Sequence, residues 1–379
     1  MRDKVQSYIF FLLENSLFLM VGTILGLAWA NLHWDSYERI SAAIHFPVNE
    51  IAMAFFFGIA AKEVFESLLP GGALSSPRKA AMPLLATLGG MIGPATLYVL
   101  GALLLGRHEL LRGWAIPCAT DIAFSYLIAR FIFGDKHPAI PFLLLLAIAD
   151  DGGGLLILAL FYPTGNVRLG LFAALVVGAL VVAYLLKRQK VTNFWPYIAI
   201  SGPLSWLGFY YGGLHPALAL VPIIFAMPHE ASDIGIYAEQ EETQLDALNQ
   251  FKHWWKNPVE VILALFGFVN AGVMFTSVGA GTWLVCIGLI IGKPLGITLF
   301  SLLGRAFGLS LPDGMHWNEL VVLGCAAGIG FTVALFVSTV AFPIGGILDA
   351  AKMGALFSFG SMLITIIAAK VLGVKPLRV

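Results

Sequence analysis

Two adjacent carboxylates, Asp150 and Asp151, stand in the middle of an apolar stretch that runs from Pro138 to Tyr162. A helix of about 20 apolar residues crosses a bilayer, so both acids would lie near mid-depth. A charged aspartate costs roughly 2.5–3.5 kcal/mol there even on permissive scales, and such residues are functional by default. Paired acids in this position indicate a site that binds or moves something charged.

Two further ionisable residues, Asp121 and Lys293, fall at a similar depth in other apolar segments. Four unpartnered charges would together cost roughly 10–14 kcal/mol, so they need mutual pairing, a wet cavity or proton uptake. Adjacent residues of a helix diverge by about 100°, so Asp150 and Asp151 cannot share one face. We expect one carboxylate to pair with Lys293 while the other faces a cavity.

Two apolar segments, one in each half of the chain, contain helix-breaking residues. Pro117 removes a backbone donor, and Thr120 and Asp121 favour local hydrogen bonds. The second segment contains Gly328-Ile329-Gly330-Phe331-Thr332, whose glycines would serve equally well in close helix packing. Paired interruptions of this kind indicate a transporter site. They leave helix ends inside the membrane, whose partial charges Asp121 and Lys293 could neutralise.

The composition is that of an integral membrane protein. The chain has 379 residues, of which 59% are hydrophobic and 12% charged, against about 25% charged in soluble domains. The net charge is zero, so no overall field favours nucleic acid. The three cysteines lie in apolar segments and are interpreted as small core residues: Cys118, Cys286 and Cys325.

Twelve apolar segments are candidate membrane spans. They are residues 8–30, 47–69, 81–105, 114–132, 138–162, 168–186, 194–211, 214–228, 258–278, 282–303, 317–342 and 353–374. The first has no small-residue cleavage site and is expected to be a retained helix. Fifteen Lys and Arg residues fall on the side of the N-terminus and five on the other, which predicts that both termini are cytoplasmic.

One long polar stretch, about 229–257, is cytoplasmic on this topology. Asn257 could cap a following helix, with Pro258 at its first position and Glu260 at its third. The polar stretch itself is either a solvated linker or a regulatory segment.

Five motifs resemble the NhaA-type sodium/proton antiporter family. They are Ala119-Thr120-Asp121-Ile122-Ala123-Phe124, Asp150-Asp151 followed by Gly153, Asn270-Ala271-Gly272-Val273, Gly292-Lys293-Pro294-Leu295-Gly296-Ile297 and Gly328-Ile329-Gly330-Phe331-Thr332. They occur in family order over about residues 50–345. The resemblance implies an all-α membrane fold in one domain, 1–379, with about twelve transmembrane helices. It implies inverted-topology repeats at about 81–162 and 282–374, and two discontinuous helices that cross at mid-membrane.

The resemblance also implies an activity, the export of Na+ or Li+ in exchange for H+ across a bacterial inner membrane. In the family pattern, Asp151 matches the principal cation ligand and Asp150 the carboxylate that pairs with Lys293. Thr120 matches a residue near the ion, and Asp121 one that balances helix-end charge. The helix break matches Gly328, Gly330 and Thr332. A transporter rather than an enzyme is expected, with no cofactor, with the lipid bilayer as its surroundings and with exchange that moves net charge.

The chain departs from the family pattern at several positions. Gly152 and Gly154 replace bulkier residues beside the acidic pair, and Glu50 replaces an aspartate. Lys252 stands where an acid is expected, which puts the pH response in question. The residues that match the pH-responsive positions are Glu63, His215 and His253, of which His215 is expected in an exposed loop. Residues 31–46 look too short for the β-hairpin that joins protomers in the family, so a homodimer is uncertain.

Other functions are open to a membrane protein with buried acids. An intramembrane aspartyl protease would show Tyr-Asp and Gly-x-Gly-Asp motifs on separate spans, and neither is present. A proton-coupled transporter of another cation or an organic ion could share the scaffold, although an organic anion would favour a cationic or aromatic pocket. A cation channel would present acidic rings by symmetry. The choice among Na+, Li+ and K+ does not follow from the sequence.

Overall fold

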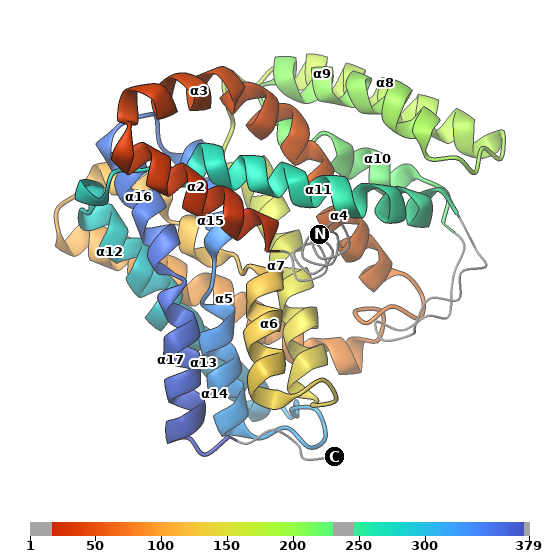
Figure 1. Cartoon of the computed structure of the whole chain (residues 1–379). Helices are drawn as coiled ribbons and strands as arrows, with labels where there is room; N and C mark the ends of the chain where they lie inside the picture. Colours follow the sequence, from red (N-terminus) through yellow and green to blue (C-terminus); the bar gives the residue numbers. More distant parts are fainter. Residues whose placement is uncertain (1–16, 230–245, 375–379) are drawn as a thin grey trace, which may run out of the picture. The chain divides into compact units, whose positions relative to one another are not determined.

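The computed structural model describes residues 17–229 and 246–374 (Figure 1). Every regular element in these ranges is a helix, which confirms the all-α membrane architecture. Six of the described helices are long and apolar enough to cross a bilayer, and two bent helix pairs raise the number to eight. The other four predicted spans are also helical in their described parts, but these helices are shorter or more polar.

The helices form two compact units, and the single transporter domain over residues 1–379 stays a prediction. Unit 1 comprises Met1–Ser75 and Leu155–Gly272. Its elements are α2 (Phe18–Leu32), α3 (Trp34–Phe46), η1 (Pro47–Ala52), α4 (Met53–Leu68), α8 (Leu169–Arg188), η4 (Tyr197–Ser201), α9 (Gly202–Gly212), η5 (Pro216–Leu218), α10 (Leu220–Ala226) and α11 (Ala247–Ala271).

Unit 2 comprises Ser76–Gly154 and Val273–Val379 and contains most of both predicted repeats. Its elements are α5 (Pro77–Leu104), η2 (His108–Gly113), η3 (Ile116–Cys118), α6 (Ile122–Phe133), η6 (Phe275–Ser277), α12 (Ala280–Ile287), η7 (Gly288–Gly292), α13 (Lys293–Ala306), α14 (Trp317–Ala327), α15 (Phe331–Ala341), α16 (Gly346–Phe357) and α17 (Gly360–Val371). Helix α7 (Ala139–Phe161) begins in unit 2 and ends in unit 1. The inverted relation of the repeats stays a prediction.

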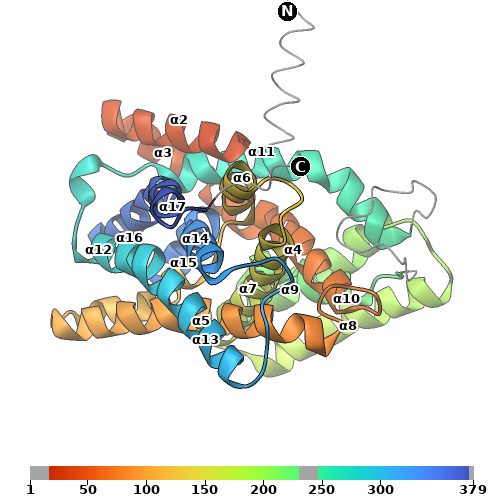
Figure 2. The same ribbon diagram turned by 90° about the horizontal axis from the view of Figure 1, so that it is seen from below.

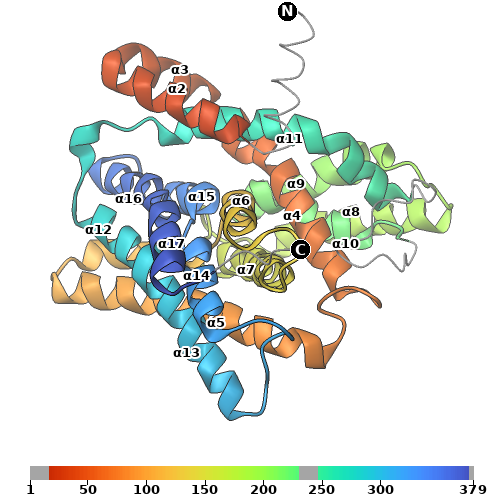
Figure 3. The ribbon, with the colours of Figure 1, turned by 60° about the horizontal axis from the view of Figure 1, so that its bottom comes forward.

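Glycines bring α5 and α13 of unit 2 into direct backbone contact, and Figures 2 and 3 show the two helices crossing. A Cβ atom on Gly89 would lie 2.1 Å from the carbonyl oxygen of Gly296, and one on Gly93 would lie 2.4 Å from that of Gly292. This is the small-xxx-small packing by which membrane helices approach closely. The contact holds Lys293 against α5, because Lys293 lies between Gly292 at the end of η7 and Gly296 in α13.

Two spans of unit 2 are broken where the sequence predicted interruptions. His108–Cys118 and Ile122–Phe133 form one bent pair with an angle of 53°, and Trp317–Ala327 and Phe331–Ala341 form the other with an angle of 49°. Four half-helices therefore end within the predicted apolar depth. In Figure 1, α14 lies beside α17 in this unit, in agreement with their contacts.

In unit 1, the predicted start of the helix at Pro258 is wrong. The helix α11 begins at Ala247, because the side chain of Asp246 accepts a hydrogen bond from Asn249 N at 2.7 Å and caps it. Pro258 lies inside the helix, which continues along α2 in spite of the missing donor. Of the predicted polar stretch, residues 230–245 lie outside the described part.

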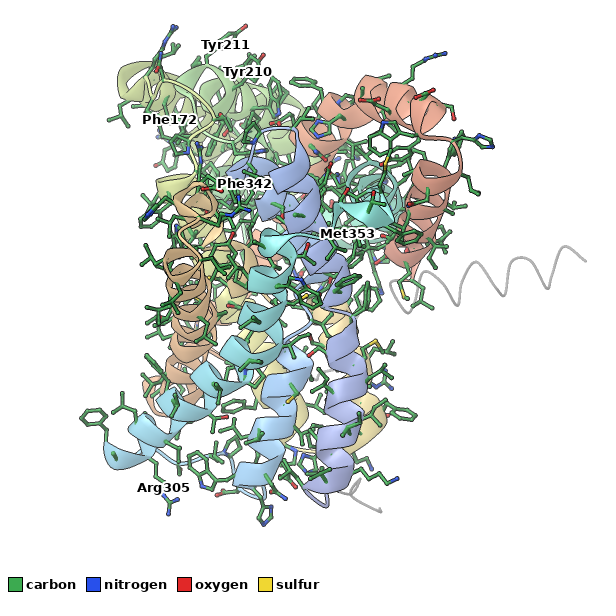
Figure 4. All side chains as sticks on the ribbon, turned by 90° about the vertical axis from the view of Figure 1, so that its left-hand side faces the viewer. Phe172, Tyr210, Tyr211, Arg305, Phe342 and Met353 are labelled. Atoms are coloured by element: carbon green, nitrogen blue, oxygen red, sulfur yellow. The ribbon has the colours of Figure 1, made fainter. Side chains whose placement is uncertain are left out.

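The segment expected to replace the family β-hairpin is helical. Residues 34–46 form α3, which continues through η1 into α4. Elsewhere in unit 1, α8 packs on α9, and Tyr210 and Tyr211 lie exposed at the end of α9 (Figure 4). Exposed tyrosines at a helix end are typical of membrane–water interfaces.

Candidate cation site

A buried ion pair joins α7 to α13 in unit 2. The Nζ atom of Lys293 lies 2.7 Å from Oδ2 of Asp150, and the two side chains are 0% and 1% exposed. Lys293 also donates a hydrogen bond to the carbonyl oxygen of Cys118. Cys118 is the last residue of η3, so the ammonium group lies at the partly negative end of the first half-helix. One lysine therefore serves both a carboxylate and a helix terminus.

The second carboxylate oxygen of Asp150, Oδ1, has fewer hydrogen-bond partners than Oδ2. Thr120 lies beside Asp150, with its N–H and its hydroxyl close to the carboxylate. No hydrogen bond of normal geometry reaches the buried Oδ1 atom of Asp150 from the described residues. A buried anionic oxygen without full hydrogen bonding is costly. It is an acceptor suited to a cation or a proton.

Asp121 connects the N-terminal ends of two half-helices. Its side chain caps α6 by accepting from Phe124 N at 3.4 Å. Its other oxygen accepts from Thr332 N at 3.1 Å, in the first turn of α15, and from the Thr332 hydroxyl. The Asp121 N–H donates to the carbonyl of Ile329 at 2.7 Å. A single negative charge thus faces two partly positive helix ends.

Thr120 occupies the first helix break, opposite the second. Its hydroxyl donates to the carbonyl oxygen of Ala327 at 3.2 Å. Since a hydroxyl has one proton and two lone pairs, this bond leaves the Thr120 oxygen able to accept. It is therefore a neutral oxygen ligand that stands beside an anionic one.

The glycines of the second break are required by close packing. A Cβ atom on Gly328 would lie 2.7 Å from the carbonyl oxygen of Leu289, and one on Gly330 would lie 2.6 Å from the Leu289 side chain and 3.0 Å from Ala119 O. The packing interpretation of these glycines is therefore correct. The same packing brings the second break against the first, next to Thr120.

The remaining predicted residues are distributed as follows. Asp151 follows Asp150 in α7 of unit 2 and is half-buried. The predicted pH-responsive residues belong to unit 1. There Glu63 lies 3.4 Å from Lys252, and His253 is exposed. The expectation that His215 is exposed is wrong, because it is only 4% exposed.

His215 is buried because its loop packs against the helix that contains Glu50. Its Nδ1 atom lies 3.6 Å from the Glu50 carboxylate and accepts a hydrogen bond from Ala217 N at 3.3 Å. The Trp206 indole also donates to the Glu50 carbonyl at 2.8 Å. Hydropathy alone cannot distinguish such a covered loop from a solvated one.

The sequence interpretation missed Ser125 and Ser361. Both are fully buried, and their hydroxyls donate to Ala326 O at 2.9 Å and to Cys325 O at 2.7 Å. Isolated serines on the apolar faces of helices beside a break were the available signal. The Cys118 carbonyl was also missed, because a backbone acceptor has no sequence signature.

The sequence is similar to known sodium/proton antiporters. The sequence profile of the family described as Na+/H+ antiporter 1 matches residues 12–372. The Na(+)/H(+) antiporter NhaA of Jannaschia sp. (strain CCS1) is 46% identical over 96% of this chain and 98% of its own. That of Geobacter metallireducens (strain ATCC 53774 / DSM 7210 / GS-15) is 46% identical over 96% and 97%.

One solved structure has a similar fold. It is that of the sodium proton antiporter MjNhaP1 from Methanocaldococcus jannaschii at pH 8, with a TM-score of 0.55 and 13% identity. The similarity covers 95% of this chain and 92% of the other. At this identity the comparison bears on the fold alone.

Proposed function

The chain belongs to the Na+/H+ antiporter 1 family and is a multi-pass sodium/proton antiporter, and we propose that Asp150 and Asp151 carry its exchange reaction. The observation that supports this proposal most strongly is the buried Asp150–Lys293 pair, in which one carboxylate oxygen lacks a hydrogen bond of normal geometry among the described residues. The pair lies where the two broken helices meet. The carboxylate can therefore bind a cation or a proton there, in addition to the partial charges of the helix ends.

Exchange proceeds by competition between the cation and protons. Sodium is a hard cation that takes oxygen ligands, and Asp151, Asp150, Thr120 and water provide them. Protonation removes the negative charge that holds the ion, so either cargo excludes the other. We assign proton coupling to the set formed by Asp150, Asp151 and Lys293 rather than to one side chain.

The helix ends keep the site stable in both loading states. Asp121 compensates the partial positive charge of two helix N-termini, and Lys293 compensates the partial negative charge of one C-terminus. The transported ion is therefore not needed to neutralise these helix ends. The site then opens to the two sides of the membrane in turn. With two protons per Na+, each cycle moves net charge and responds to membrane potential.

We place the protein in the inner membrane of a bacterium, with both termini on the cytoplasmic side. The excess of Lys and Arg in the loops on the side of the N-terminus supports this orientation. Li+ is a second cargo because it shares the oxygen preference and charge of Na+. The helical α3 at the position of the family hairpin argues against a hairpin-mediated homodimer.

The proposal is tested by Na+-induced dequenching of a pH-sensitive dye in everted membrane vesicles. Asp151→Asn should abolish the response while the protein remains in the membrane, because an amide cannot exchange charge for a cation. Asp135→Asn is the matched control, since this acid is exposed and pairs with Arg130 away from the site. A full response from Asp151→Asn would refute the site. A zero current under a Na+ gradient in proteoliposomes would refute the stoichiometry.

A further inference from the structure

Three hydroxyl groups bind three consecutive carbonyls at the C-terminal end of α14. The bonds are Ser361 to Cys325 O at 2.7 Å, Ser125 to Ala326 O at 2.9 Å and Thr120 to Ala327 O at 3.2 Å. The three donors are 0–1% exposed. Gly328 N and Ile329 N also bond back to the first two carbonyls, at 3.1 and 3.3 Å. The third carbonyl, that of Ala327, accepts its hydrogen bond from Thr120.

The C-terminal end of α14 has a different kind of hydrogen-bond donor from the C-terminal end of η3 in the first broken span. At the C-terminus of η3, the charged Lys293 donates to the Cys118 carbonyl. At the end of α14, the side-chain donors within residues 17–229 and 246–374 are neutral hydroxyls. A helix C-terminus carries about half a negative charge, and its carbonyls need partners at membrane depth. Hydroxyls supply the partners without cancelling the charge, so the end stays attractive to a cation.

One turn of α6 holds both half-helices of the second span. Asp121, at the cap of α6, binds the first turn of α15 through Thr332. Ser125 lies one turn further on, and its N–H bonds back to Asp121 O at 3.0 Å. Its hydroxyl reaches the last turn of α14. The distance between the two half-helices at the break is therefore fixed from a single turn of one neighbouring helix.

We propose that Ser125 and Ser361 are positioning residues for the cation site. They hold the last turn of α14 so that Ala327 O accepts the hydrogen bond that the Thr120 hydroxyl donates, which leaves the lone pairs of the Thr120 oxygen available to a cation. The inference rests on the proposed role of Thr120 beside Asp150. Without the serines the turn loosens, and the Thr120 hydroxyl is released to donate to the carboxylate, where it competes with the incoming cation.

The experiment measures the apparent KM for Na+ and the maximal exchange rate in proteoliposomes. Ser125→Ala should raise KM roughly two- to ten-fold, the equivalent of one hydrogen bond, and should change the maximal rate less. Ser361→Ala should act in the same direction, and Ser125→Thr, which keeps the hydroxyl, should restore KM. Ser338→Ala is the matched control, because this fully buried serine bonds only Ala334 O of its own helix in the described contacts.

A double-mutant cycle with Thr120→Ala separates positioning from general stability. If Ser125 acts through Thr120, adding Ser125→Ala to Thr120→Ala leaves KM unchanged. Additive effects, or a normal KM in monodisperse Ser125→Ala protein, would overturn the inference. If Thr120→Ala alone leaves KM unchanged, the ligand role assigned to Thr120 fails, and this inference fails with it. Exchange by the unaltered protein tests the antiporter function independently of either result.

Discussion

Replacing Lys293 by methionine should destabilise the protein more than any loss of packing explains. Methionine keeps most of the volume of the lysine side chain but leaves Asp150 as an unpaired buried charge. Breaking one side of a buried ion pair costs roughly 3–5 kcal/mol. The Cys118 carbonyl loses its donor as well, which adds to the loss. The thermal midpoint in detergent should fall by several degrees.

Removing both charges should recover most of that stability. In the double variant Asp150→Asn with Lys293→Met, no unpaired charge remains. The Cys118 carbonyl still lacks its partner, which costs about 1–3 kcal/mol. We therefore expect the double variant to lie between Lys293→Met and the unaltered protein.

The assay follows loss of the monodisperse peak on size exclusion after heating, at one heating time for all variants, since unfolding of this kind is commonly irreversible. Lys62→Met is the control. The Nζ atom of Lys62 lies 2.5 Å from the carboxylate of Glu66, whose side chain is 30% exposed. Water can therefore solvate Glu66 when the lysine is removed, and the loss of stability should be smaller than for Lys293→Met. A double variant as labile as Lys293→Met would refute the reasoning, because the pair would then not be energetically coupled.

Three further predictions use the same stability assay. Asp121→Asn removes the negative charge from two helix N-termini, at about 0.3–1 kcal/mol each, and leaves one acceptor oxygen for two caps, at about 0.5–2 kcal/mol for the lost cap, so it should cost roughly 1–4 kcal/mol; a midpoint equal to that of the unaltered protein would contradict the double-cap role. Gly89→Val should prevent folding, because even a Cβ atom would lie 2.1 Å from a carbonyl of the crossing helix, whereas Gly154→Ala, whose Cβ meets nothing within 4 Å, should fold normally. Asn49 and Asn270 exchange two amide hydrogen bonds of 3.2 and 2.8 Å, so either alanine variant should cost about 1–3 kcal/mol and the second substitution should add little.

The sequence predicted those parts of the site in which a charged or helix-breaking residue interrupts an apolar segment, because such residues cost free energy in a membrane helix. Buried charges such as Asp121 and Lys293 stand out because the membrane penalises them wherever they occur. The helix breaks stand out because Pro117 and the glycines at 328 and 330 disfavour a continuous helix. The observed bends fall at these positions.

The features that the sequence could not predict are fixed by tertiary packing, because several local sequence patterns were equally compatible with each of them. Asp246 and Asn257 are both competent caps, and the residues between them make the earlier start favourable, because Phe251 is buried and packs against α4. The burial of His215 depends on contacts with a helix more than 150 residues earlier in the chain. Serines such as Ser125 look unremarkable until the carbonyls that they bind are in place.

The two helix breaks explain why the site can exchange charges rather than merely store them. If Lys293 gave all its donors to Asp150, the carboxylate would be neutralised and a cation would gain little by binding. Instead the lysine divides its donors between Asp150 Oδ2 and the Cys118 carbonyl. The Cys118 carbonyl therefore weakens the ion pair between Lys293 and Asp150. The Oδ1 atom of Asp150 can still accept a proton or bind a cation. A residue that competed with Cys118 O for the lysine would shift this balance, so the broken helix is part of the chemistry as well as of the scaffold.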